Sequence, residues 1–293
     1  MWDLLVEIHI IVRGRDGLVR GNAPLETDGS SKLNASLRER FPQYKRETDL
    51  LGLVGPRLAE CVSGKTDAAS VMFGSLSSLR IMESFYADSP MLSTLNDQLV
   101  HFVVNFATER RSDESTPLRI LEVGAGTGSA TARLVEGLGQ TDRAIEYTIT
   151  DISSAFVAQA KRRFKQYPWV SFGTFDFEKD PAEPFRNHFD IVIGANAVHA
   201  ASDRTAACCR LHGTLREGGF MVLAEVTRPV NWYDICFGLL DGWWLAEGGK
   251  GYPIQAAEKW MATFRRAGFD TVGCSQGDSL EAESQQLLVG WTR

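Results

Sequence analysis

The chain has 293 residues, of which 44% are hydrophobic, and this is enough apolar material for a substantial buried core. Its formal net charge of −6 at pH 7 gives no general attraction to phosphate backbones, so a nucleic-acid partner is disfavoured. No run approaches the roughly 20 apolar residues that cross a bilayer, and the five cysteines include no C-x-x-C pair. We therefore expect a cytoplasmic protein without a membrane segment, a disulfide framework or a metal site.

The first third of the chain is predicted to be helical. Residues 1–31 form an N-terminal extension that ends in a linker rich in Gly, Pro, Asp and Ser, from Gly21 to Ser31. Apolar residues then recur at three-and-four spacing, which predicts helices with one buried face over 33–41, 47–61 and 92–109. The polar run from Arg110 to Pro117 marks a boundary, so residues 32–116 are expected to form a helical N-terminal subdomain.

From residue 117 to 293, short β-rich runs alternate with helical ones. The predicted strands are LRILEVG (118–124), EYTITD (146–151), WVSFGTFD (169–176), DIVIGANAV (190–198), MVLAEV (221–226), FDTVGC (269–274) and LLVGW (287–291). Helices are expected through Val135, through Tyr167 and over 205–216. Such alternation is typical of βαβ units, so we predict an α/β domain with a Rossmann-like, seven-stranded sheet whose last two strands form an edge hairpin.

A glycine-rich turn follows the first of these strands. It reads Glu122-x-Gly124-Ala125-Gly126-x-Gly128 and leads into a helix. Glycines let the backbone turn tightly and approach a ligand at the helix N-terminus. Nicotinamide enzymes hold a pyrophosphate on a similar turn, but the Glu122 carboxylate would repel a pyrophosphate and suits the sulfonium and amino groups of S-adenosylmethionine. The sequence therefore favours S-adenosylmethionine over a dinucleotide.

The ends of the next three strands complete the predicted cofactor site. Asp151 ends the second strand, where a carboxylate can accept both ribose hydroxyls, and Ile152 follows it. Asp176 and Phe177 follow the third strand, where a carboxylate and a ring suit adenine, although an acidic turn beside a core phenylalanine gives the same pattern. At the fourth strand, the stretch from Gly194 to Ala197 lies opposite the glycine turn across the switch-point crevice and is expected to complete the pocket, with Asn196 as its cofactor-binding residue.

Several stretches resemble a known family. They are KTDAASVMFG (65–74), FYADSPM (85–91), ILEVGAGTGSAT (120–131), YTITDIS (147–153), NAVHA (196–200), LREGGFMVLAEVTRP (215–229) and WYDICFGLLDGWWL (232–245). From about residue 30 onward they make the chain similar to the C-methyltransferase domains of fungal iterative polyketide synthases, especially the non-reducing type. The stretch GGKGY, from Gly248 to Tyr252, departs from the acidic turn expected there.

The resemblance implies a class I methyltransferase fold and a carrier-bound substrate. In that family a histidine base, helped by a glutamate, removes a proton from the activated carbon of a β-ketoacyl chain on an acyl carrier protein, and the enolate takes the methyl group. The matching residues are His199 and Glu225, and the other domains of a synthase are the implied partners. Independently, these residues follow neighbouring strands, an imidazole is mostly neutral at cellular pH, and a carboxylate can fix its tautomer. A satisfied histidine and a helix-capping glutamate are the alternatives.

The residues around the predicted substrate are less specific. The apolar segment 237–245 is expected to form a lid helix over the acyl chain, with plain core packing as the alternative. Tyr86 is expected to cover the cofactor or to orient the substrate, unless it is an ordinary interface tyrosine. A solvated helix face is favoured over carrier docking for the basic run 161–165. The predicted substrate-binding residues are Trp232, Phe237, Trp243 and Trp244.

Two other interpretations of the function stay open. An O- or N-methyltransferase that acts on a free small molecule would need no carrier-bound thioester. A methyltransferase-like module without catalytic activity would need no cofactor, but the intact Gly124, Asp151, His199 and Glu225 argue against it.

Overall fold

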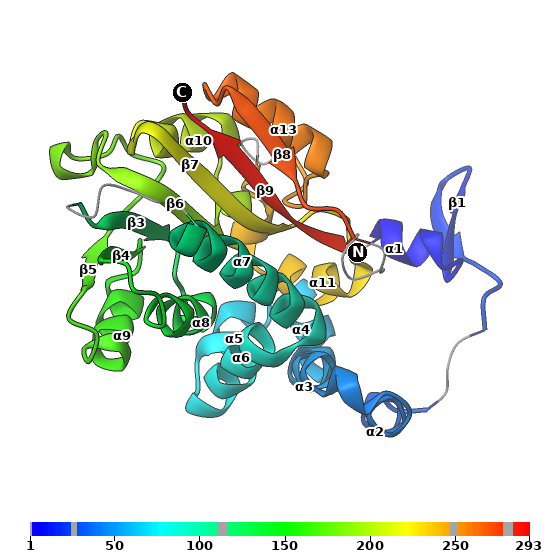
Figure 1. Cartoon of the computed structure of the whole chain (residues 1–293). Helices are drawn as coiled ribbons and strands as arrows, with labels where there is room; N and C mark the ends of the chain where they lie inside the picture. Colours follow the sequence, from blue (N-terminus) through cyan, green and yellow to red (C-terminus); the bar gives the residue numbers. More distant parts are fainter. Residues whose placement is uncertain (1, 25–27, 110–115, 247–250, 278–283) are drawn as a thin grey trace. The chain divides into compact units, whose positions relative to one another are not determined.

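The computed structural model describes residues 2–24, 28–109, 116–246, 251–277 and 284–293 (Figure 1). Contacts within the chain form two units. The helical unit comprises Met1–Phe85 and Val230–Trp243, and the sheet unit comprises Tyr86–Pro229 and Trp244–Arg293. The domain limits expected at residues 31/32 and 116/117 stay predictions.

The sheet unit is built on a seven-stranded sheet with the strand order β5-β4-β3-β6-β7-β9-β8. Its strands are β3 (Leu118–Val123), β4 (Ile145–Asp151), β5 (Val170–Thr174), β6 (Phe189–Ala195), β7 (Leu215–Val226), β8 (Thr271–Cys274) and β9 (Gln285–Trp291). Strands β3 to β7 pair in parallel, whereas β9 is antiparallel to both β7 and β8. This arrangement confirms the predicted Rossmann-like sheet and its terminal hairpin. After β3, the chain adds β4 and β5 on one side of that strand and then adds β6 on its other side. A switch point therefore lies between β3 and β6.

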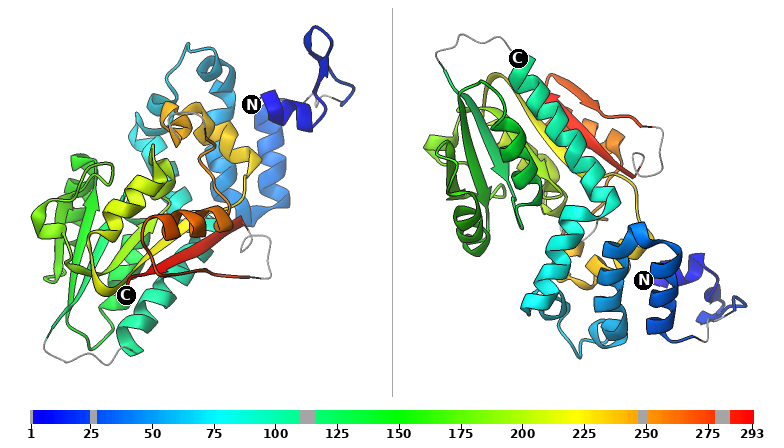
Figure 2. Two further views of the ribbon diagram at one scale, coloured as in Figure 1. Left: turned by 90° about the horizontal axis from the view of Figure 1, so that it is seen from above. Right: turned by 60° about the horizontal axis from the view of Figure 1, so that its bottom comes forward.

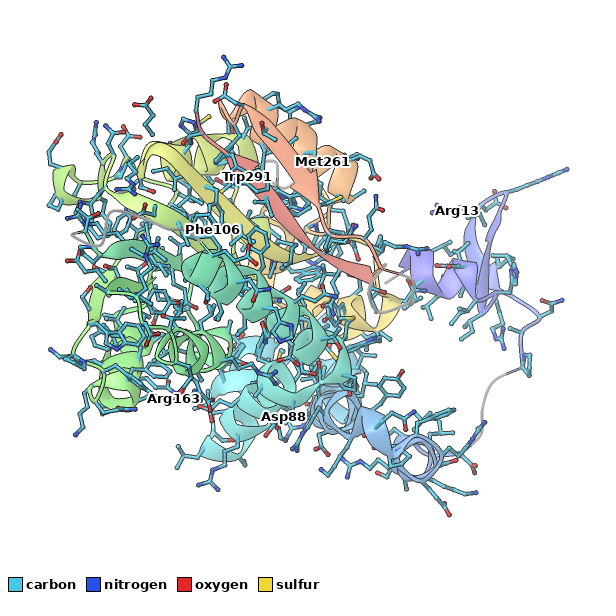
Figure 3. The ribbon with its side chains drawn as sticks, viewed as in Figure 1. Arg13, Asp88, Phe106, Arg163, Met261 and Trp291 are labelled. Atoms are coloured by element: carbon cyan, nitrogen blue, oxygen red, sulfur yellow. The ribbon has the colours of Figure 1, made fainter. Side chains whose placement is uncertain are left out.

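Helices pack on both faces of this sheet (Figure 2). They are α7 (Pro90–Glu109), α8 (Ser129–Leu138), α9 (Ser154–Phe164), α10 (Arg204–His212) and α13 (Ala257–Arg266), with the 3-10 turns η3 (Glu183–Phe185) and η4 (Val198–Ala200). Successive strand residues point to opposite faces, so Ile120 packs with α7, α8 and α9 and Leu121 packs with α10 and α13. On the first face, the ring of Phe106 meets that of Phe220 edge-on, with 4.7 Å between centroids (Figure 3).

The helical unit consists of short helices, 3-10 turns and one hairpin. Its elements are α1 (Trp2–Glu7), β1 (Ile11–Gly14), β2 (Gly17–Arg20), α2 (Ser30–Arg40), η1 (Pro42–Tyr44), α3 (Lys45–Val54), η2 (Gly55–Arg57), α4 (Leu58–Val62), α5 (Ala68–Phe73), most of α6 (Leu76–Asp88), α11 (Asn231–Cys236), η5 (Phe237–Leu239) and η6 (Asp241–Trp244). The hairpin and the helices α5 and α6 were not among the predicted elements. A local signal for α5 exists, because Asp67 caps it by accepting hydrogen bonds from the amides of Ala69 and Ser70.

The predicted helix limits differ from the structure by a few residues, and two of the predicted helices differ in more than that. The helix expected over 47–61 is interrupted by η2, because Pro56 has no amide hydrogen to donate and its ring obstructs the preceding turn. The helix expected over 205–216 ends at His212. The chain turns at Gly213, and Arg216 already belongs to β7, where it forms an ion pair with the buried Asp190.

Three of the predicted features fall wholly or partly outside the described residues. These are residues 25–27 of the predicted linker, residues 110–115 of the predicted boundary, and residues 248–250 of the stretch that departs from the family pattern. Within the part of the chain that the structure does describe, no helix is both long enough and apolar enough to span a membrane.

A buried carboxyl group, Glu122, joins β3, β4 and α8. Its side chain accepts hydrogen bonds from the hydroxyls of Thr131, at 2.9 Å, and Tyr147, at 2.8 Å, and the residue is only 1% exposed. Burial raises the pKa of Glu122 from 4.5 to about 7, and the two hydrogen bonds offset part of that rise. The group therefore binds its proton more tightly in the folded protein than in the unfolded chain.

This difference predicts a pH dependence of stability. As the pH rises from 4.5 to 7, the unfolded chain releases a proton that the folded protein still holds, so the stability present at acid pH is lost. The full loss is on the order of 3 kcal/mol and is complete above pH 7. Urea unfolding at pH 5 and at pH 7.5 covers most of this range and should show wild type losing about 2 kcal/mol more than Glu122→Gln. The same pH dependence in both proteins would contradict the assignment.

Candidate active site

The glycine-rich turn connects β3 to α8 in a backbone conformation that requires glycine. Gly124, Gly126 and Gly128 have φ values of +65°, +54° and +74°, in the left-handed region that other residues rarely adopt. A Cβ added to Gly124 would lie 2.5 Å from the Cβ of Ala197. The turn thus packs directly against the loop that follows β6, as the switch-point argument predicted.

Asp151 holds the turn from the end of β4. One of its carboxylate oxygens accepts the amide hydrogen of Gly126 at 2.9 Å, and the other accepts that of Ser153 at 2.8 Å. Each oxygen can accept a further hydrogen bond, so the carboxylate can still bind hydroxyl groups. The next residue, Ile152, is 70% exposed and offers an apolar surface beside that carboxylate. Ala125 donates its amide hydrogen to the carbonyl of Thr150 and fixes the turn on β4.

Glu122 lies beneath the turn. Thr131 and Tyr147 occupy its oxygens, and its raised pKa weakens the argument that a negative charge here selects a sulfonium ligand. A direct contact between Glu122 and a cofactor stays a prediction. Its partners Thr131 and Tyr147 were not singled out in the sequence, because nothing local indicates that a threonine and a tyrosine converge on one glutamate.

Asp176 and Phe177 lie after β5. Lys179 forms an ion pair with Asp176 at 3.0 Å, and this contact, with the amide hydrogen of Glu178, holds the pKa of Asp176 below its usual range. Phe177 is half-buried and packs against the core beneath α10 and α13. Both the cofactor interpretation and the turn-and-core interpretation are compatible with these contacts.

Tyr86 lies beside the first turn of α8. Its carbonyl accepts a hydrogen bond from the hydroxyl of Ser129 at 2.9 Å, and the carbonyl of Ala87 accepts one from Arg133 at 2.9 Å. Burial raises the pKa of Tyr86 to about 12, so its hydroxyl stays protonated and can donate. The tyrosine is therefore held next to the helix N-terminus at which the glycine turn ends.

His199 and Glu225 form a pair at the carboxyl ends of β6 and β7. Nδ1 of His199 lies 2.7 Å from one carboxylate oxygen of Glu225, which is 0% exposed. The other oxygen accepts three consecutive amide hydrogens, from Ala197 at 3.2 Å, Val198 at 3.0 Å and His199 at 3.3 Å. With Nδ1–H donated to the carboxylate, the lone pair of a neutral imidazole lies on Nε2.

The loop that carries His199 begins with an unusual backbone conformation. Asn196 has a φ of +50° and donates its amide hydrogen to the carbonyl of Ala224 at 2.8 Å. Asparagine tolerates the left-handed region better than most residues do. This change of direction places the next three amides against Glu225 and places Ala197 against the glycine turn. Asn196 therefore has a structural role in the loop. Its contact with a cofactor stays a prediction.

The predicted substrate residues fall into two environments. In the helical unit, Phe237 lies 5.2 Å from Tyr233 and 5.7 Å from Trp243, centroid to centroid, and Trp232 lies 5.6 Å from Phe85. In the sheet unit, Trp244 is 40% exposed, and its ring centroid lies 6.2 Å from that of Tyr252. The lid helix expected over 237–245 is instead two 3-10 turns, η5 and η6, which matches the low helix propensity of the glycines at 238 and 242.

The basic run 161–165 ends α9. Lys161, Arg162, Arg163 and Lys165 are exposed, as expected for a solvated face. The guanidinium of Arg163, which is labelled in Figure 3, also donates a hydrogen bond to the carbonyl of Thr127 at 3.1 Å and so supports the glycine turn. Sequence reasoning did not foresee that contact, because it depends on how α9 packs.

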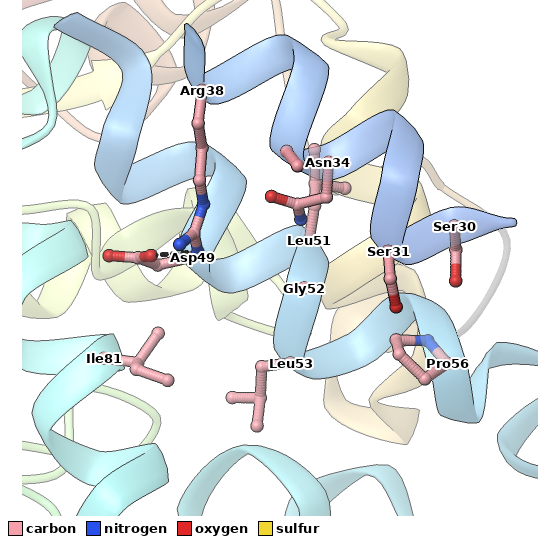
Figure 4. Close-up of a pocket in the computed structure, with 11 residues that line it drawn as sticks. Ser30, Ser31, Asn34, Arg38, Asp49, Leu51, Gly52, Leu53, Pro56 and Ile81 are labelled. Atoms are coloured by element: carbon pink, nitrogen blue, oxygen red, sulfur yellow. Dashed lines mark hydrogen bonds and ion pairs between the residues drawn. The ribbon is translucent and has the colours of Figure 1, made fainter. Parts of the chain in front are cut away.

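A cavity of about 500 Å³ lies within the helical unit, between α2, α3 and α6 (Figure 4). An ion pair between Arg38 and Asp49 closes one side. No predicted site residue lines this cavity.

Comparisons with known proteins agree with this arrangement. Residues 121–221 match a family described as a methyltransferase domain. A non-reducing polyketide synthase of Stereocaulon alpinum is 40% identical over 293 residues, a match that covers 100% of this chain but only 12% of the synthase. The solved CMeT domain of the citrinin polyketide synthase is 32% identical with a TM-score of 0.95, covering 99% of this chain and 76% of that one. The DszA carbon methyltransferase is 29% identical with a TM-score of 0.90, covering 99% and 77%.

The glycine turn after β3, the carboxylate at the end of β4 and this similarity over nearly the whole length of the chain agree with one another. The chain belongs to the carbon methyltransferase domains of fungal non-reducing polyketide synthases, which are S-adenosylmethionine-dependent enzymes.

Proposed function

We propose that this domain methylates the α-carbon of a β-ketoacyl thioester carried by an acyl carrier protein, with His199 as the general base and Glu225 as its partner. The observation that carries the proposal is the pair itself. A buried carboxylate holds the imidazole at 2.7 Å, and the same loop packs against the glycine turn. A base and a nucleoside-binding turn at one sheet edge suit the transfer of a group onto a carbon that must first lose a proton.

The residues at this edge fit S-adenosylmethionine. Gly126 leaves open space where a side chain would stand, Asp151 has lone pairs for ribose hydroxyls, and Ile152 offers an apolar face for a base. The backbone carbonyl of Tyr86 is held at the N-terminus of α8, and we propose that the tyrosine covers the cofactor from there. The bound cofactor supplies an electrophilic methyl group.

His199 and Glu225 perform the proton transfer. The α-hydrogen of a β-ketothioester is acidic because the electron pair left behind is shared with two carbonyl groups. Nε2 of His199 takes that proton, while the hydrogen on Nδ1 stays hydrogen-bonded to the carboxylate of Glu225. The imidazolium that forms is therefore paired with a carboxylate that is already in place. The electron pair on the α-carbon would form the new carbon–carbon bond as the methyl–sulfur bond of the cofactor breaks, and the sulfur would keep that bond's electrons as a neutral thioether.

Carrier delivery is proposed from the relatives. They are multidomain polyketide synthases, of which this chain spans about 12%, so other synthase domains are its expected neighbours. An O- or N-methyltransferase of free small molecules is the second candidate. It has less support, since the solved structures that match this chain at 32% and 29% identity are a CMeT domain and a carbon methyltransferase.

Trp244 is the best supported of the proposed substrate contacts. It is exposed at 40%, whereas Phe237 is buried, Trp243 is half-buried and the two rings stack on each other. We propose that Trp244 contacts the acyl chain or its thioester arm, and that Trp232, Phe237 and Trp243 shape the helical unit.

We expect His199→Ala to lower kcat for a β-ketoacyl thioester by about 10²–10⁴-fold, the usual worth of a general base. Glu225→Gln should lower it less, because the imidazole remains but its tautomer is no longer fixed. Both variants should bind S-adenosylmethionine like wild type in calorimetry. Asp151→Ala is the matched control, since it should weaken cofactor affinity by about 10-fold or more through the loss of charged hydrogen bonds.

His199→Ala tests the proposed base, and Asp151→Ala tests the proposed cofactor site. A His199→Ala enzyme that methylates at the wild-type rate removes this histidine from the mechanism and favours the O- or N-methyltransferase. Unchanged cofactor affinity in Asp151→Ala would remove Asp151 from the cofactor site.

The two adjacent tryptophans should respond differently to truncation. Trp244→Ala should raise KM for the thioester by about 10-fold with little change in stability, because the ring is exposed and its loss removes little buried surface. Trp243→Ala should lower the free energy of unfolding by about 3 kcal/mol, as expected for truncation of a packed ring. Steady-state kinetics and urea unfolding measure both effects. If Trp244→Ala leaves KM unchanged, the proposed substrate contact is wrong.

A further inference from the structure

A buried arginine, Arg204, lies directly behind the His199 loop. It is the first residue of α10, and it is only 5% exposed. Its guanidinium donates hydrogen bonds to the side-chain oxygen of Gln255 at 3.1 Å and to the carbonyls of Tyr252 and Pro253 at 2.8 and 2.9 Å. A buried guanidinium must satisfy its donors, and these contacts satisfy several of them.

The same guanidinium reaches the proposed base. Its Nε donates to the carbonyl of His199 at 3.4 Å. This carbonyl belongs to η4, a turn too short to continue its own hydrogen-bond pattern: the amide of Ser202 donates to the side chain of Glu178 instead. The amide of His199 is held by Glu225 and its carbonyl by Arg204, so both backbone polar groups of the residue are fixed.

A second layer fixes Arg204 itself. Its guanidinium carbon lies 5.9 Å from the ring centroid of Trp260, a fully buried residue of α13, and Gln255 donates in turn to the hydroxyl of Thr263 at 3.3 Å. Hydrogen bonds in several directions combined with a ring contact need a planar, delocalised cation. A lysine ammonium is a compact charge that cannot reproduce this arrangement.

We infer that Arg204 is a positioning residue, which aligns the His199 imidazole for proton abstraction without touching the substrate. The inference rests on the proposed function, because it assumes that His199 is the base. Misplacement of a catalytic group by about 1 Å can cost on the order of 100-fold in rate. A residue that acts only through alignment should therefore change the rate of proton abstraction and leave cofactor affinity intact.

Hydrogen exchange at the α-carbon reports the proton abstraction alone. The full chain is saturated with S-adenosylhomocysteine, which has no methyl group to transfer, and is incubated in D2O with a β-ketoacyl thioester. Deuterium incorporation above the uncatalysed rate is measured by mass spectrometry for wild type, His199→Ala, Arg204→Lys and Arg210→Lys. Arg210 lies on the same helix but pairs with Asp180 near the surface, so Arg210→Lys is the matched control.

We expect Arg204→Lys to slow the exchange by at least about 10-fold, Arg210→Lys to leave it unchanged, and His199→Ala to abolish it. S-adenosylhomocysteine affinity should stay at the wild-type value in Arg204→Lys, and the assay is run well below its unfolding temperature. A merely structural role would slow the exchange only in proportion to the unfolded fraction.

Wild-type exchange in Arg204→Lys, with exchange lost in His199→Ala, would overturn the role of Arg204 and leave the proposed base intact. Wild-type exchange in His199→Ala would overturn the proposed function, and the positioning role with it. If Arg204→Lys does not fold, Gln255→Met keeps the arginine but removes one of its acceptors. It should also slow the exchange, and wild-type exchange in that variant would equally overturn the inference.

Discussion

The active edge of the sheet depends on the buried carboxylate of Glu225. A carboxylate removed from water is costly unless hydrogen bonds compensate it, and here three backbone amides and one imidazole do so. Those four donors must all converge on one group, and this requirement fixes the path of the loop after β6. It accounts for the left-handed conformation of Asn196 and for the position of Ala197 against Gly124.

The order of the strands explains why the chemical groups gather at one place. β3 and β6 are neighbours at the switch point, and β7 lies next to β6, so the glycine turn, the His199 loop and Glu225 follow three adjacent strands. Support comes from behind this edge. Glu122 ties the turn to β4 and α8 through Tyr147 and Thr131, and Arg204 ties the His199 loop to α13 and the segment before it.

Local patterns were enough to predict the seven-stranded sheet, the glycine turn, and the proximity of His199 and Glu225. Each depends on strand periodicity or on which strand ends are neighbours. Other features depend on long-range packing that a single sequence does not record. The direction of the Glu122 side chain, the contact of Arg163 with the turn and the burial of Arg204 are of this kind. Trp243 and Trp244 are adjacent in sequence, yet one stacks on Phe237 and the other is exposed.

The tautomer of His199 tests the central claim most directly. Nitrogen-15 NMR of the labelled imidazole, at a pH where the ring is neutral, distinguishes a protonated ring nitrogen from one with a free lone pair. If Glu225 orients the base, Nδ1 carries the hydrogen and Nε2 is unprotonated, because the carboxylate accepts the Nδ1–H hydrogen bond. A ring protonated at Nε2, with Nδ1 bare, would contradict the account, since Glu225 would then have no hydrogen to accept from the imidazole and Nε2 no lone pair for the substrate proton.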